Sequence, residues 1–173
     1  MHDIEDIIKA GNFTGGAITR GVDDKDRCIL PREYRDEAEK WGKELNLFPI
    51  EKRDPDSEMR DYYLKLHTPE SYKMLMQTLF PKGIKTQMAK DRHRDVMEMR
   101  QVVTFDTAWR FSIREDLLEV LGKPEKVVLI GVGDGVELWS PEVYERLQLK
   151  KAETRKSSVK AISFDVFDED DLM

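Results

Sequence analysis

The sequence has little of the chemistry that marks disulfide-rich or metal-binding proteins. Its 173 residues include one cysteine, Cys28, which excludes an intrachain disulfide and a zinc site built from several cysteines. Cys28 lies in the short apolar run Cys-Ile-Leu, which favours a buried thiol over a reactive one. The three histidines, His2, His67 and His93, lie far apart and lack the spacing of metal ligands. We therefore expect no metal.

Long apolar runs are also absent. No uninterrupted apolar stretch reaches the roughly 18 residues of a membrane span. The N-terminus, MHDIEDIIKAG, carries acidic residues where a signal peptide would carry lysines. We therefore expect a soluble, cytoplasmic protein, which would be nucleoid-associated if it binds DNA. No nucleophile and base, and no group of carboxylates, have a spacing that would serve catalysis, so we expect neither an enzyme nor a cofactor.

Charge is abundant but unevenly distributed. Charged side chains make up 37% of the residues, and the formal net charge is -6 at pH 7. An acidic total argues against a simple basic coat for nucleic acid. Residues 80–94 nevertheless carry five cations against one aspartate, and the last nine residues are strongly acidic. A solvated linker, a second phosphate contact or a subunit contact would each explain the basic stretch.

The chain contains two copies of one pattern. The stretch V-D-D-K-D-R-C-I-L at 22–30 aligns with F-D-T-A-W-R-F-S-I at 105–113. The offset is 83 residues, so that position 23 corresponds to position 106. The equivalent residues are Asp23 with Asp106 and Arg27 with Arg110. A second match aligns L-H-T-P-E-S-Y-K-M-L at 66–75 with L-W-S-P-E-V-Y-E-R-L at 138–147, at an offset of 72. Two ordered matches indicate a tandem duplication, with 11 additional residues between the landmarks in the first copy.

Each landmark predicts a local structure. An aspartate and an arginine four residues apart can close a tight loop, since the carboxylate accepts N–H groups of the turn and pairs with the guanidinium. Strand-like residues flank both loops, and short helices are expected at 31–34 and 114–122. In the second landmark, Thr68 and Ser140 are expected helix N-caps, each followed by proline at the first helical position.

Two apolar runs around Asp-Gly, at 127–132 and 136–139, predict a β-hairpin. Gly131, Gly133 and Gly135 in this region do not form a dinucleotide-binding loop, because a strand rather than a helix is expected to follow them. We expect Trp139 and Tyr144 to pack where the hairpin meets the next helix. Each copy is thus predicted as strand, loop, strand, short helix, hairpin and capped helix.

These residues resemble the bacterial MraZ family, tandem-repeat relatives of the AbrB-type swapped-hairpin transcription factors. The segments that carry the resemblance are D-D-K-D-R-C-I-L-P-R-E-Y-R at 23–35 and V-V-L-I-G-V-G-D-G-V-E-L-W at 127–139. The resemblance implies an α+β, mainly β fold. Two AbrB/MraZ-like repeats would form a swapped-hairpin, double-psi-like barrel with short flanking helices. It also implies a ring-shaped homo-oligomer that binds repeated promoter sites and represses a division and cell-wall gene cluster.

The predicted organisation has five parts. They are an N-terminal helical extension at 1–12, a first repeat at 13–79, a basic connector at 80–99, a second repeat at 100–149 and a charged, largely disordered tail at 150–173. The acidic end of the tail either keeps the protein soluble, docks a protein partner through Phe164 and Phe167, or occupies the basic face of the protein as a mimic of DNA.

Carried over position by position, the resemblance places the DNA-binding face on the first repeat. The predicted DNA-binding residues are Arg20, Lys25, Arg27, Arg32 and Arg35. Asp23, Asp106 and Arg110 are predicted to shape the two loops, and the second loop is expected to be structural or to contact another subunit. The alternative for both Asp–Arg pairs is a salt bridge that only closes a turn.

The sequence departs from the family pattern at three positions. Members usually have glycine before the loop arginine, where the backbone can take a positive φ, whereas this chain has Asp26 and Trp109. Arg114 replaces the proline that follows the second loop. A second function class is therefore kept beside the DNA-binding regulator: an oligomeric scaffold or partner-binding protein of the same fold with weak or lost DNA binding.

Overall fold

The computed structural model describes residues 9–54 and 58–154. The first repeat consists of β1 (Ile18–Gly21), β2 (Arg27–Ile29), the 3-10 helix η1 (Arg32–Tyr34), α2 (Arg35–Lys40), β3 (Glu44–Arg53), β4 (Arg60–His67) and α3 (Pro69–Leu79). Helix α4 (Gln87–Met99) follows. The second repeat consists of β5 (Gln101–Thr104), β6 (Arg110–Ser112), α5 (Glu115–Val120), β7 (Lys126–Gly131), β8 (Gly135–Trp139) and α6 (Pro141–Thr154).

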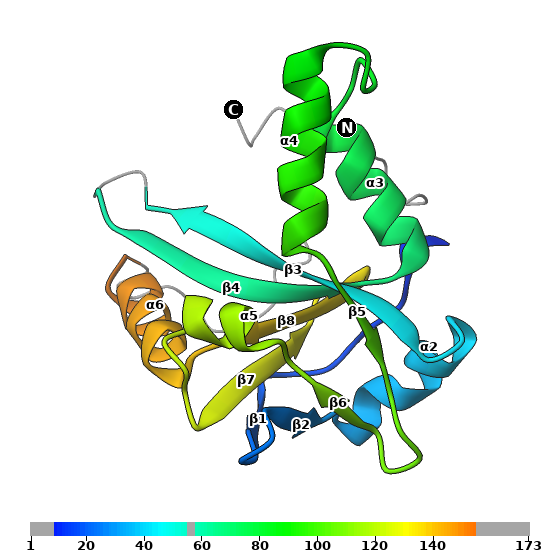
Figure 1. The fold of residues 1–173 in the computed structure, drawn as a ribbon. Helices are drawn as coiled ribbons and strands as arrows, with labels where there is room; N and C mark the ends of the chain where they lie inside the picture. The colour runs from blue at the N-terminus through cyan, green and yellow to red at the C-terminus, as the bar shows by residue number, and fades with distance from the viewer. Residues whose placement is uncertain (1–8, 55–57, 155–173) are drawn as a thin grey trace, which may run out of the picture.

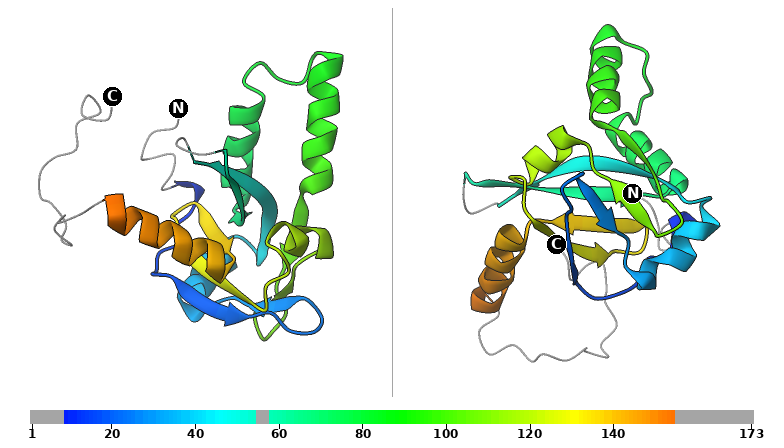
Figure 2. Two further views of the ribbon diagram at one scale, coloured as in Figure 1. Left: turned by 90° about the vertical axis from the view of Figure 1, so that its left-hand side faces the viewer. Right: turned by 60° about the horizontal axis from the view of Figure 1, so that its bottom comes forward.

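The strands form a six-stranded antiparallel sheet, ordered β1-β7-β8-β4-β3-β5, and a separate two-stranded ribbon of β2 and β6. The large sheet curls across the middle of the molecule (Figure 1). Helices α3 and α4 project from one side of it, and the β2–β6 ribbon lies with α2 on the other, as both views in Figure 2 confirm. The fold is therefore α+β and mainly β, as predicted.

The two repeats are interleaved. Strand β1 pairs with β7 and β3 pairs with β5, so each repeat supplies an edge strand to the hairpin of the other. The registers are equivalent: Gly21 lies opposite Lys126 in one pair, and Thr104 lies opposite Glu44 in the other. Strands β2 and β6 pair with each other, as do β4 and β8. The pairing thus follows a pseudo-twofold axis that matches the duplication in the sequence.

The additional residues of the first repeat lengthen its hairpin. Strands β3 and β4 contain 10 and 8 residues, whereas β7 and β8 contain 6 and 5. The tip of the long hairpin is tied to α6, because Arg146 Nη2 donates to the Asp61 carboxylate at 2.5 Å. Asp61 is 8% exposed, so this pair fixes α6 against the sheet.

The core lies between the curled sheet and the elements that close it. Its fully buried side chains come from both repeats and include Leu30, Tyr34, Leu45, Leu47, Leu64, Leu66, Phe111, Val127, Leu129, Val136 and Leu138. The predicted helix caps are present: Thr68 Oγ1 accepts from Ser71 N at 3.0 Å, and Ser140 Oγ accepts from Val143 N at 3.2 Å. Trp139 is 5% exposed and stacks on Tyr63 with ring centroids 4.5 Å apart.

Three parts of the predicted organisation are seen only in part. The stretch expected as a connector at 80–99 contains the 13-residue helix α4. The predicted start of the tail at residue 150 falls inside α6, which runs to Thr154. Most of the helical extension predicted at 1–12 lies outside the described residues. Phe164 and Phe167, on which the alternatives for the tail depend, also lie outside them. No helix within 9–54 and 58–154 is long and apolar enough to cross a membrane.

Candidate nucleic-acid interface

The first candidate loop, residues 23–27, is closed by the aspartate at its start. Asp23 Oδ1 accepts from the backbone N–H groups of Lys25 at 3.0 Å and Arg27 at 2.8 Å. Arg27 Nε donates to Asp23 Oδ2 at 2.8 Å. One carboxylate therefore fixes both the turn of the backbone and the direction of the guanidinium.

The second loop, residues 106–110, repeats this arrangement atom for atom. Asp106 Oδ1 accepts from the N–H groups of Ala108 at 2.9 Å and Arg110 at 2.8 Å, and Arg110 Nε donates to Asp106 Oδ2 at 2.7 Å. Hydrogen bonding lowers the pKa of both aspartates, and in each loop the largest contribution comes from the N–H of the arginine. Both loops therefore hold their carboxylate in the charged form.

The position before each arginine adopts a positive φ, as expected from the glycine that the resembled family has there. Asp26 has a φ of 59° and Trp109 a φ of 61°. The carbonyl of each then pairs with the opposite repeat: Ile113 N donates to Asp26 O at 2.8 Å, and Leu30 N donates to Trp109 O at 2.9 Å. The loops thus keep their shape without glycine, because each is bonded to the strand end of the other.

The predicted DNA-binding cations lie in this loop and in the elements next to it. Lys25 is exposed in the loop, and Arg32 is exposed in η1. Arg27 is held by Asp23, with 29% of its side chain exposed. Arg20, in β1, is half-buried and donates through Nη1 to the carbonyl of Thr19 at 3.1 Å.

Arg35 has a structural contact. It is half-buried, and its Nε donates to the carbonyl of Leu30 at 3.0 Å, which anchors α2 to the end of β2. The five cations of residues 18–36 are matched by five acidic residues, Asp23, Asp24, Asp26, Glu33 and Asp36. One copy of this face therefore has no net charge, and an interaction with phosphate would depend on where individual side chains point.

Arg114 has a role that the sequence did not reveal. It stands where the first repeat has Pro31, and its guanidinium donates to the carbonyls of Glu98 at 2.9 Å and Arg100 at 3.1 Å. These carbonyls lie at the end of α4, where helix C=O groups lack partners within the helix. Asp116 holds the guanidinium from the other side at 2.6 Å. Arg114 therefore joins the second repeat to α4.

A second polar cluster lies between the repeats, with His67 and Ser71 buried and Lys65 and Asp134 partly exposed. His67 Nδ1 lies 2.7 Å from Ser71 Oγ, Ser71 Oγ donates to Asp134 Oδ2 at 3.2 Å, and Lys65 Nζ donates to Asp134 Oδ1 at 2.8 Å. His67 is 4% exposed, and burial lowers its pKa to about 3. The serine lies between the histidine and the aspartate, so this is not the order of a catalytic triad, in which histidine is central. The cluster joins β4, α3 and the β7–β8 turn.

Cys28 is buried as predicted. It is 1% exposed and lies opposite Phe111, its equivalent in the second repeat. Burial raises the pKa of its thiol to about 12, so it is protonated at neutral pH. Among the residues that the structure describes, no three His, Cys, Asp or Glu side chains gather to hold a metal ion.

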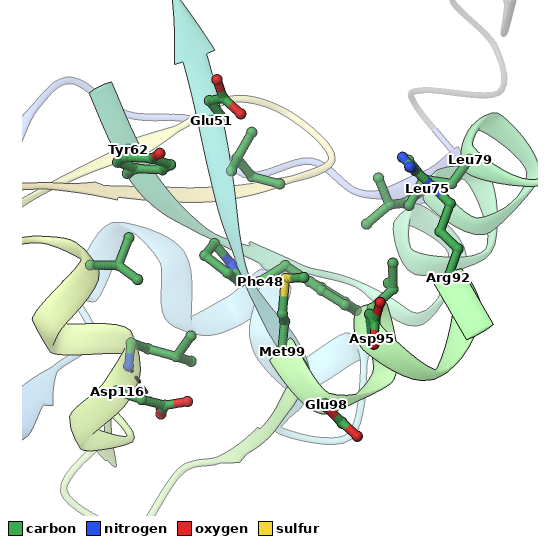
Figure 3. Close-up of a pocket in the computed structure, with 15 residues that line it drawn as sticks. Phe48, Glu51, Tyr62, Leu75, Leu79, Arg92, Asp95, Glu98, Met99 and Asp116 are labelled. Carbon is green, nitrogen blue, oxygen red and sulfur yellow. Dashed lines mark hydrogen bonds between the residues drawn. The ribbon is translucent and has the colours of Figure 1, made fainter. Parts of the chain in front are cut away.

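An open apolar groove of about 980 Å³ lies between α3, α4, α5 and the long hairpin. Figure 3 shows side chains from all of these elements facing it, including Leu75 and Leu79 from α3, Tyr62 from β4 and Asp116 from α5. Carboxylates line its rim: Glu51, Asp95, Glu98 and Asp116. This rim disfavours an anionic ligand such as phosphate.

Comparison with known proteins points to one family. A family model described as "MraZ protein, putative antitoxin-like" matches residues 99–166. A protein named Transcriptional regulator MraZ, from Mycoplasmopsis pulmonis (strain UAB CTIP), is 26% identical over 133 residues, which are 77% of this chain and 82% of that protein. One of the same name from Thermomicrobium roseum (strain ATCC 27502 / DSM 5159 / P-2) is 27% identical over 127 residues, 73% of this chain and 81% of that protein.

Proposed function

Because this chain belongs to the MraZ family, we propose that it is a transcriptional regulator that binds promoter DNA through the first-repeat loop. The full proposal is a ring-shaped homo-oligomer that acts in the cytoplasm, at the nucleoid, on repeated promoter sites. It would repress a cell-division and cell-wall gene cluster. The contacts to DNA would come from Lys25, Arg27 and Arg32, with Arg20 and Arg35 at the edges of the face.

The observation that carries this proposal is the preserved shape of the loop. Asp23 fixes the Arg27 guanidinium while part of that side chain stays exposed, and Lys25 extends from the same turn. A guanidinium held in one direction loses little conformational entropy when it binds a phosphate or a base edge. The absence of the glycine therefore does not argue against DNA binding, since Asp26 adopts the required positive φ.

Assembly would compensate for the weak charge of one copy. The cations and acidic residues of 18–36 cancel, so a single subunit offers only a few phosphate contacts. Several identical faces on a ring would contact repeated sites together, and the linked contacts would raise the overall affinity by orders of magnitude. We therefore expect binding that is modest for one site, steep in salt and dependent on the number of sites.

The test is DNA binding by the double variant Lys25→Ala/Arg27→Ala, measured on the DNA upstream of the protein's own gene over a series of salt concentrations. The affinity should fall, and the slope of log affinity against log salt should decrease by about one for each phosphate that the variant no longer neutralises. Size-exclusion chromatography should show the same oligomer as the parent protein.

The chain supplies a matched control, Arg110→Ala. It removes the same hydrogen bonds from a loop of the same shape in the second repeat, so its effect on stability should equal that of Arg27→Ala. Its affinity for DNA should stay at the parent value. Equal reductions of affinity in both single variants, or no reduction in the double variant, would contradict the assignment of the DNA-binding face to the first repeat.

A second candidate is a scaffold of the same fold without DNA binding. The balance of five cations and five acidic residues beside the first loop favours it. Retention of the parent protein on heparin at moderate salt, together with a shift of promoter DNA in a gel, would decide against the scaffold.

A further inference from the structure

The end of the helical hairpin formed by α3 and α4 is strongly basic. We call residues 80–94 the hairpin tip. Its cations are all exposed: Lys82, Lys85, Lys90, Arg92 and Arg94. Its single acidic residue, Asp91, is paired with Arg94 at 3.4 Å. The tip therefore carries a net charge of +4 on a chain whose total is -6.

Large apolar side chains are exposed among these cations. Met88 is 82% exposed and Ile84 is 38% exposed. Helix α4 has no buried residue along its 13 positions, which is unusual for a helix with well-separated polar and apolar faces. A basic surface with exposed methionine and isoleucine suits a partner that offers carboxylates and apolar side chains together.

The hairpin tip lies far from the proposed DNA face. The tip projects from one side of the sheet, whereas the β1–β2 and β5–β6 loops lie at the opposite end of the molecule (Figures 1 and 2). Phosphate would also leave the exposed apolar side chains without a partner, because the phosphate backbone offers only charge.

This chain itself contains a segment with the required chemistry. Its last ten residues, F-D-V-F-D-E-D-D-L-M at 164–173, carry five carboxylates, two phenylalanines and no cation. We propose that this C-terminal segment docks on the hairpin tip, of the same copy or of a neighbouring copy. Its carboxylates would pair with Lys82, Lys85 and Lys90, and Phe164 and Phe167 would cover Met88 and Ile84.

The chain between α6 and the C-terminal segment limits how far the segment can reach. Nine residues, 155–163, separate Thr154 at the end of α6 from Phe164, and the ten steps of an extended chain span about 33 Å at roughly 3.3 Å each. The apolar groove beside α4 is a poorer site for the segment, since Asp95 and Glu98 on its rim would repel carboxylates. The proposal concerns a surface separate from the DNA face and does not depend on DNA binding.

The test is carbodiimide cross-linking of the full-length protein, because this reagent adds no spacer and joins a lysine directly to a carboxylate that lies in contact with it. Mass spectrometry should find links from Lys82, Lys85 or Lys90 to residues 165–171, with few links from the exposed Lys52. The links should disappear at high salt, since exposed pairs are screened. Mixing isotope-labelled and unlabelled protein shows whether the segment docks within one copy or between copies, and either result supports the proposal.

Two variants test the apolar part of the contact without removing a reactive group. Met88→Ser and the double variant Phe164→Ser/Phe167→Ser should each lower the yield of these links about tenfold, the reduction expected when a buried apolar side chain is replaced. Met99→Ser is the control, because Met99 is also partly exposed, at 44%, but lines the groove. It should leave the yield unchanged.

Three results would overturn the proposal. The first is that the segment links mainly to Lys25, which would make it a competitor for the DNA face. The second is that its links follow only the exposure of each lysine. The third is that the parent protein forms no links to the segment, while Lys82→Gln/Lys85→Gln lowers both the affinity for DNA and the salt dependence of that affinity. This result would make the tip a phosphate contact.

Discussion

Replacing Tyr34 with phenylalanine removes one oxygen atom that joins three parts of the molecule. Tyr34 lies in η1, is completely buried and donates its hydroxyl to the carbonyl of Gly16 at 3.1 Å, just before β1. The same oxygen accepts from the N–H of Gly131 at 3.0 Å, at the end of β7. The ring also packs edge-on against Phe13, with centroids 6.3 Å apart. The hydroxyl therefore links the start of the first repeat to the hairpin of the second.

The expected destabilisation follows from what the substitution leaves behind. Tyr34→Phe keeps the ring and its packing, so no large cavity forms. The Gly16 carbonyl belongs to an exposed residue and can bond to water, whereas the Gly131 N–H faces the ring and loses its acceptor. A polar group that loses its partner costs about 1 to 3 kcal/mol when buried, and the part-buried Gly131 N–H should lie toward the lower end of this range. In a chain of this length that corresponds to a fall in melting temperature of roughly 3 to 10 °C.

Urea denaturation followed by circular dichroism, at a fixed protein concentration, measures this destabilisation. Tyr62→Phe is the control, because Tyr62 is 41% exposed and its variant should match the parent protein. The midpoint for Tyr34→Phe should shift while the slope m stays constant, since the surface exposed on unfolding is the same. A midpoint equal to that of Tyr62→Phe would refute the idea that this hydroxyl bridge holds the repeats together.

Two further predictions concern the buried histidine and the loop positions with positive φ. Because the folded state holds the pKa of His67 at about 3 and the ordinary value is 6.5, only the unfolded state binds the proton between these values. The free energy of unfolding should therefore fall by up to about 1.4 kcal/mol per pH unit as the pH drops below 6.5. The variant His67→Gln should lose this pH dependence when the free energy of unfolding is measured by urea titration at each pH. If the variant keeps the pH dependence of the parent protein, His67 is not its cause. Asp26→Gly should change the free energy of unfolding by less than about 1 kcal/mol, because relief of the positive φ is offset by the more flexible unfolded chain. Trp109→Gly relieves the same φ but should destabilise the protein by about 2 kcal/mol or more in thermal melts, because the indole packs on Phe105 and under Lys43. Equal effects of Asp26→Gly and Trp109→Gly would show that this packing is unimportant.

The duplication in the sequence predicted the order of strands, loops and helices within each repeat, whereas the interleaving of the two repeats was implied only by the family resemblance. The offset of 83 relates Cys28 to Phe111, which lie opposite each other in β2 and β6. The offset of 72 relates β4 to β8, which pair symmetrically, with Leu64 opposite Leu138 and Leu66 opposite Val136. The Asp-x-x-x-Arg spacing predicted the loop, since both hydrogen-bond partners of Asp23 lie within four residues of it. Local features of this kind depend on neighbours in the chain and can therefore be predicted from it.

The contacts that the sequence did not reveal depend on distant residues. In the sequence, Arg114 is noticeable only because it replaces a proline. Its function becomes clear in the structure, where the carbonyls at the end of α4 lie beside it. Helix α4 was expected only as a connector, because its sequence is rich in charged residues, and in the structure none of its residues is fully buried. Its cap at Thr86, which accepts from Ala89 N at 3.1 Å, was the available signal. The DNA-binding residues remain a prediction, because the structure shows their positions and not their ligand.

The interleaved sheet also has a consequence for synthesis on the ribosome. Strand β1 is made early, but its partner β7 begins only at Lys126, and β3 waits in the same way for β5 at Gln101. The first repeat therefore emerges with unpaired strand edges and cannot close its sheet while the second repeat is still in the exit tunnel. Pairing between such distant segments is slow, and open strand edges invite association with other chains. A nascent chain stalled before residue 126 should consequently depend on chaperones, whereas one that has released β8 should close in a single cooperative step.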